Sequence, residues 1–81
     1  MTVTAETVQN LEAEAKSAEE SAIRAYATWA DAYAKLLKGE VSVEIEQDSL
    51  TAMRLADEAK GRAEHAFKKA RLMYAMSLAN D

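Results

Sequence analysis

Residues 35–46, with the sequence KLLKGEVSVEIE, decide the fold. Lys35 and Lys38 precede Gly39, and glycine readily adopts the left-handed conformation that ends many helices. Lysines in a last helical turn also interact favourably with the helix dipole. Ser42 can then cap a new helix, with Glu44 in its first turn. The stretch therefore predicts a helix that ends near residue 38, a turn at about 39–41, and a second helix that begins near residue 42.

Outside this turn the sequence carries uninterrupted helical signals. Thr4 can cap the first helix, and Glu6 follows in its first turn. Proline is absent, about a fifth of the residues are alanine, and the only other glycine is Gly61, which costs about 1 kcal/mol relative to alanine in a helix. We therefore expect an all-α fold in which residues 1–81 form one antiparallel two-helix hairpin, with helices over about 4–38 and 42–79.

Apolar and small residues recur along both predicted helices in alternating steps of three and four, which is the spacing of a coiled coil. If the two series face each other, Leu36 meets Ile45 and Trp29 meets Ala52. Such an alanine-rich coiled-coil seam would let the axes approach to about 8 Å. The first series is Val8, Leu11, Ala15, Ala18, Ala22, Ala25, Trp29, Ala32 and Leu36, and the second is Ile45, Ser49, Ala52, Ala56, Ala59, Ala63, Ala66, Ala70, Met73 and Ser77.

The charge pattern favours the same antiparallel arrangement. Residues 6–20 carry five acids and one base, whereas residues 60–71, which would lie beside them, carry five bases and one acid. Residues 24–38 carry three bases and one acid, and they would lie beside residues 40–58, with six acids and one base. Single exposed pairs contribute little, but the pattern as a whole disfavours parallel helices.

A second apolar series lies one residue beyond the predicted seam and would occupy one lateral face of the hairpin. We refer to it as the apolar stripe, and its members are Ile23, Tyr26, Tyr33, Leu37, Leu50 and Met53. A two-helix hairpin cannot bury this stripe internally unless the helices cross obliquely. We therefore expect another protein surface to cover it, with a homodimer that forms a four-helix bundle as one outcome.

The turn end of the hairpin is acidic. Glu40, Glu44, Glu46 and Asp48 lie close together in the sequence and form a possible acidic contact for a basic protein groove, or an imitation of nucleic acid. The simpler interpretation is a solvated N-terminal turn, where carboxylates are favoured by the helix dipole.

The sequence offers no constellation of catalytic residues. His65 is the only histidine, the residues three and four positions before it are Arg62 and Gly61, and cysteine is absent. The Glu-x-x-His pattern of helical metal sites is therefore missing, and no serine has a histidine placed to activate it. We expect no catalytic residues, no metal and no cofactor.

Charge and hydropathy narrow the classes of partner. A net charge of −4 opposes nucleic-acid binding, which depends on neutralising phosphates. No apolar run approaches the roughly 18 residues that cross a membrane, and the first residues lack the pattern of a signal peptide. We therefore predict a cytoplasmic, non-enzymatic protein-binding module of the inhibitor or adaptor type, which docks its apolar stripe or its acidic turn on a larger protein. The alternatives are a purely structural homo-oligomer and a small protein that binds or mimics nucleic acid.

Overall fold

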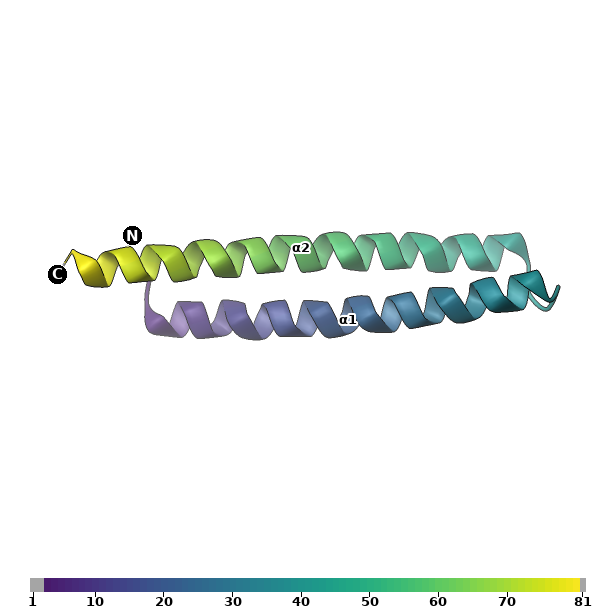
Figure 1. Cartoon of the computed structure of the whole chain (residues 1–81), viewed down its shortest axis with the longest axis horizontal. Helices are drawn as coiled ribbons and strands as arrows, with labels where there is room; N and C mark the ends of the chain where they lie inside the picture. The colour runs from purple at the N-terminus through teal and green to yellow at the C-terminus, as the bar shows by residue number, and fades with distance from the viewer. Residues whose placement is uncertain (1–2, 81) are drawn as a thin grey trace.

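The computed structural model describes residues 3–80, and these form two long helices joined by a short turn (Figure 1). Helix α1 spans Ala5–Leu37 and helix α2 spans Val43–Ala79. The two run side by side in opposite directions, so the all-α antiparallel hairpin is confirmed. The helix bounds lie within one residue of those expected, while the outer limits of the predicted domain, residues 1 and 81, lie outside the described part.

The helix ends are held by the residues that the sequence singled out. The Thr4 hydroxyl accepts a hydrogen bond from the Thr7 amide at 3.2 Å, and the Ser42 hydroxyl accepts one from the Ile45 amide at 3.3 Å. At the end of α1, Gly39 has a φ of +75°. Its amide donates to the Leu36 carbonyl and the next amide, that of Glu40, donates to the Lys35 carbonyl. This pair of bonds is a Schellman motif, which satisfies carbonyls that the helix end leaves free.

The hairpin is a rod that measures 63 × 14 × 14 Å, with a radius of gyration of 18.1 Å. A compact chain of this length would have a radius of about 12 Å. The buried apolar side chains of the described residues are those of three alanines, Ala15, Ala32 and Ala70. The two helices therefore contact each other along their length without enclosing a core of large side chains.

The buried face of α1 is the one predicted from the heptad series, since all nine of its members are buried or half-buried. The buried face of α2 differs, because Ile45, Ala52 and Met73 of the predicted seam are exposed. Helix α2 is rotated about its axis so that residues one position beyond the predicted seam, on the side of the apolar stripe, face α1. Larger side chains thereby enter the contact with α1. Its buried and half-buried heptad series is Glu46, Ser49, Met53, Ala56, Lys60, Ala63, Phe67, Ala70, Tyr74 and Ser77.

The two series in α2 share every second position, and the choice between them has a simple physical reason. Both share the small residues at 49, 56, 63, 70 and 77. The predicted series adds alanines in its central part, whereas the observed series adds Met53, Phe67 and Tyr74. Packing these against the alanines of α1 removes more apolar surface from water than packing alanine on alanine.

We predict that the two glycines respond to alanine in opposite ways. Gly39→Ala forces a side chain into the left-handed region, so the free energy of unfolding should fall by about 1 kcal/mol. Gly61 is helical and exposed, and a Cβ there would meet nothing within 4 Å, so Gly61→Ala should raise the free energy of unfolding by about 1 kcal/mol. Urea denaturation at one fixed protein concentration measures both. A loss of stability in Gly61→Ala would contradict the open surroundings of this residue.

Candidate protein-binding surface

Three aromatic rings lie in a row along α1. The Trp29 ring stacks on the Tyr33 ring with a centroid distance of 5.6 Å and an interplanar angle of 26°. On its other side it contacts the Tyr26 ring at 5.8 Å in a tilted arrangement of 51°. These separations are those of favourable aromatic pairs. The row is built by helical spacing alone, because residues three and four apart share a face.

Trp29 is anchored to α2 by a hydrogen bond in the interior of the hairpin. Its indole Nε1 donates to Oε1 of Glu46 at 2.9 Å. Only 9% of Glu46 is exposed, which makes it the buried charged residue of the described chain. A buried carboxylate requires a hydrogen-bond donor, and the indole N–H supplies one. The bond fixes the central ring of the aromatic row against the partner helix.

The rings on either side of Trp29 are open to solvent. Tyr26 is 58% exposed and Tyr33 is 45% exposed. Ile23 and Leu37, the other members of the apolar stripe on α1, are 61% and 71% exposed. Leu50 and Met53 differ from these four, because both are half-buried against α1. Met53 and Tyr26 line the same hollow of about 280 Å³, together with Ala22, Arg54 and Asp57, so the stripe continues from one helix to the other beside two charged side chains.

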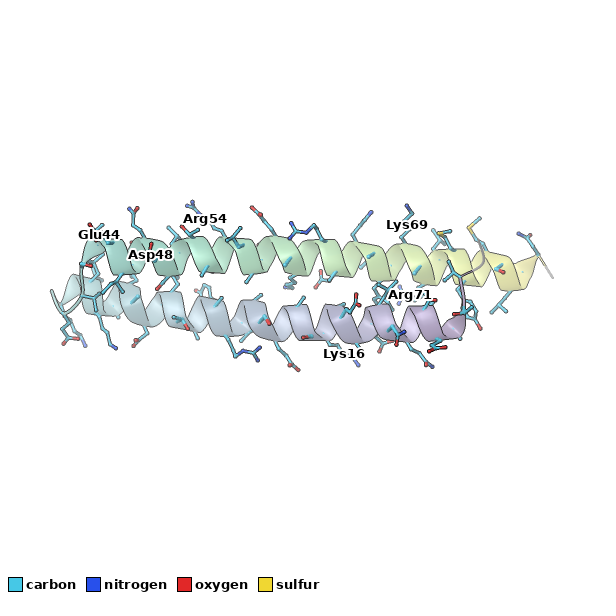
Figure 2. All side chains as sticks on the ribbon, turned by 180° about the vertical axis from the view of Figure 1, so that it is seen from behind. Lys16, Glu44, Asp48, Arg54, Lys69 and Arg71 are labelled. Carbon is cyan, nitrogen blue, oxygen red and sulfur yellow. The ribbon has the colours of Figure 1, made fainter. Side chains whose placement is uncertain are left out.

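The acidic turn end is less uniform than the sequence suggested. Glu40, Glu44 and Asp48 are exposed, and Glu44 projects from α2 into solvent (Figure 2). Glu46 differs from the prediction that placed it among these contact residues, since its carboxylate points inward to Trp29. Its inward position follows from the rotation of α2. Three carboxylates of the predicted four therefore remain available at this end.

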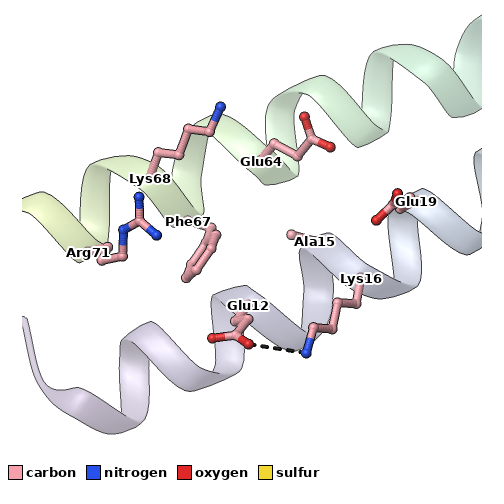
Figure 3. Close-up of a pocket in the computed structure, with 8 residues that line it drawn as sticks. All are labelled: Glu12, Ala15, Lys16, Glu19, Glu64, Phe67, Lys68 and Arg71. Atoms are coloured by element: carbon pink, nitrogen blue, oxygen red, sulfur yellow. Dashed lines mark ion pairs between the residues drawn. The ribbon is translucent and has the colours of Figure 1, made fainter.

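At the free end of the hairpin the same lateral face carries a groove between the helices (Figure 3). Its volume is about 490 Å³, and it is open to solvent. We refer to it as the free-end groove. Its lining residues are Glu12, Ala15, Lys16, Glu19, Glu64, Phe67, Lys68 and Arg71.

Charges in the free-end groove are balanced, and both helices carry both signs, with one more acid than base on α1 and one more base than acid on α2. The Arg71 guanidinium lies over the Phe67 ring, 5.4 Å from its centroid, as expected for a cation–π contact. On α1, Glu12 and Lys16 form an ion pair of 3.2 Å. Glu19 adds a second acid on α1, and Lys68 adds a second base on α2. The face therefore has an apolar half near the turn and a charged half near the free ends.

Ion pairs among residues 3–80 form within one helix rather than between the helices. They join Glu12 to Lys16, Asp31 to Lys35 at 3.0 Å, and Lys60 to Glu64 at 4.0 Å. The hydrogen bond to Asp31 and the charge of this carboxylate raise the pKa of Lys35. The oppositely charged segments of the two helices thus lie side by side, but the described residues form no ion pair between the helices.

A further set of exposed apolar side chains lies on α2, outside the apolar stripe. Ile45 and Met73 belonged to the predicted seam, and the rotation of α2 leaves them exposed. The other five were not among the predicted contact residues. The set comprises Val43, Ile45, Leu55, Leu72, Met73, Met76 and Leu78.

No group of three or more histidine, aspartate or glutamate side chains within residues 3–80 is placed to hold a metal ion. His65 is exposed. Neither helix, over its described length, has a stretch long and apolar enough to cross a membrane.

Comparison of the chain with protein-family models, with curated proteins and with solved structures finds no match.

We predict that Trp29→Phe destabilises the hairpin by about 1–3 kcal/mol, because it leaves the buried Glu46 carboxylate without its donor. Tyr33→Phe removes a polar group from an exposed ring of the same row and should change the free energy of unfolding by less than about 0.5 kcal/mol. Denaturant unfolding of both variants measures the difference.

A double variant isolates the hydrogen bond from the ring. Combining Trp29→Phe with Glu46→Leu removes donor and acceptor together, so much of the stability lost in Trp29→Phe should return. Equal stability of Trp29→Phe and Tyr33→Phe would show that the bond between Trp29 and Glu46 contributes nothing measurable.

Proposed function

We propose that this chain is a non-enzymatic protein-binding module of the adaptor or inhibitor type, and that it binds through its apolar stripe. The observation that carries the proposal is the aromatic row, in which Tyr26 and Tyr33 are exposed on either side of the anchored Trp29. Tyrosine and tryptophan are enriched at the energetically dominant positions of protein interfaces.

The stripe has the chemistry of a binding surface rather than of a chance exposure. Single exposed apolar residues are normal on proteins, whereas contiguous apolar patches mark interaction sites. Here Ile23, Tyr26, Tyr33 and Leu37 recur at three- and four-residue steps along one helix. Such a series is the usual way in which a helix presents anchors to another protein.

The rigidity of the stripe supports the same proposal. Tyr33 stacks on the Trp29 ring and Tyr26 packs against it in a tilted arrangement, while the hydrogen bond to Glu46 holds Trp29. Side chains that are already ordered lose less conformational entropy when a partner binds. The exposed carboxylates Glu40, Glu44 and Asp48 lie at the same end of the hairpin as the stripe and would favour a partner with a basic rim.

Site-specific photocrosslinking tests this function. A photoreactive phenylalanine analogue at Tyr26 or Tyr33 should yield protein adducts in the cells that make the chain, since both rings lie in the proposed interface. The same analogue at Thr28, an exposed residue on the polar side of α1, is the matched control. Equal adduct yields from Tyr26, Tyr33 and Thr28 would contradict a binding role for the stripe.

A further inference from the structure

We infer that, in the absence of another protein, the surface that covers the apolar stripe is the same face of a second copy of this chain. The two hairpins lie parallel, with their turns at one end, and form a four-helix bundle. This inference rests on the proposed function, because it assigns an occupant to the same protein-binding surface.

The first argument is the missing core. Within residues 3–80 the buried apolar side chains are three alanines, and no large side chain is fully buried. Small helical chains commonly gain stability by oligomerisation. Pairing the faces would bring the tyrosines of the stripe against the half-buried Leu50 and Met53 of the second copy, and would thereby supply the large residues that the single hairpin lacks.

The second argument concerns the division of the face into two halves. The half near the turn carries the apolar stripe, and the half near the free ends carries the free-end groove with its six charged side chains. If two hairpins lay antiparallel and overlapped fully, the apolar half of each would cover the charged half of the other. Among fully overlapped arrangements, only the parallel one places the apolar half on the apolar half and the charged half on the charged half.

The third argument is charge complementarity across the interface. A twofold axis along the rod places α1 of one copy against α2 of the other, so every neighbouring pair of helices is antiparallel. In the free-end groove, α1 contributes Glu12, Lys16 and Glu19 and is acidic on balance, whereas α2 contributes Glu64, Lys68 and Arg71 and is basic on balance. Each copy therefore presents the more acidic side of its groove to the more basic side of the other.

Light scattering on the full chain tests the association. The wild type should have the mass of a dimer, and the variant with both Tyr26→Lys and Tyr33→Lys should have a dimer dissociation constant raised roughly a hundredfold or more. Thr28→Lys with Ser21→Lys places two lysines on exposed positions of the polar side of α1 and should leave the mass unchanged. A monomeric wild type, or a dimer that the tyrosine variant does not weaken, overturns the inference.

Distances between spin labels test the orientation of the two hairpins. Cysteines for labelling replace the exposed residues Glu40 at the turn and Asn10 near the free end, in separate variants. Two parallel rods about 14 Å wide should give distances below about 40 Å at both sites. Fully overlapped antiparallel rods would separate the two Glu40 labels by about the 63 Å length of the hairpin. Antiparallel rods that overlap only near their turns would bring the Glu40 labels closer together but would move the two Asn10 labels further apart than full overlap does. A long distance at either site overturns the parallel bundle.

The two proposals fail differently. Stripe-specific photocrosslinks to other proteins, together with a monomeric wild type, would leave the protein-binding function standing and remove the second copy as occupant. Adducts that occur equally at Tyr26, Tyr33 and Thr28 would instead remove the binding role of the stripe.

Discussion

The contact between α1 and α2 is built largely from small side chains, and this constraint shapes the rest of the molecule. Alanine brings two helices close together but contributes little apolar area of its own. The interior of the hairpin accordingly holds Ala15, Ala32 and Ala70, while Tyr26, Tyr33, Ile23 and Leu37 remain outside. A two-layer rod that is 14 Å across has no third element to cover them. Exposure of the stripe is thus a consequence of how the seam is made.

The hydrogen bond between Trp29 and Glu46 links this thin seam to the binding surface. Trp29 is the large residue on α1 nearest the middle of the stripe, and its indole reaches α2 through the contact. Because Tyr26 and Tyr33 pack on the two sides of its ring, the position of α2 also fixes the outer rings. The rotation of α2 that brings Glu46 inward therefore also orders the apolar stripe. Folding and recognition depend here on the same side chain.

The sequence predicted the helices, their caps, the turn and the buried face of α1, because each depends on local signals or on an unambiguous repeat. The rotation of α2 was predicted only in part. Alanines occupy two neighbouring faces of this helix, so heptad spacing alone could not decide whether Ile45 and Ala52 or Glu46 and Met53 would face α1. From the sequence alone, a glutamate at position 46 would also be expected to face solvent and not α1. Its partner, Trp29, lies 17 residues away, and only the folded hairpin brings them together.

The same limit explains how well the candidate surface could be predicted. The four stripe residues on α1 are exposed as expected, since the face of α1 was predicted correctly. Leu50 and Met53 are half-buried, because the rotation of α2 brings this side of the helix toward the seam. The rotation places Met53 in the same hollow as Tyr26, with Ala22, Arg54 and Asp57. The same rotation places Phe67 in the contact with α1 in the charged half of the face, where the Arg71 guanidinium lies over its ring.

The two halves of this face have different physical roles in any association. Burial of the tyrosines and aliphatic residues provides affinity that depends little on direction, since the hydrophobic effect is non-directional. The acids and bases of the free-end groove are exposed and contribute little free energy each, but like charges placed together are unfavourable. These charges therefore favour some orientations of a partner over others that would bury the apolar half equally well. A surface with only the apolar half would associate without a fixed geometry, and the excess of acid on α1 and of base on α2 in the groove makes one geometry preferable.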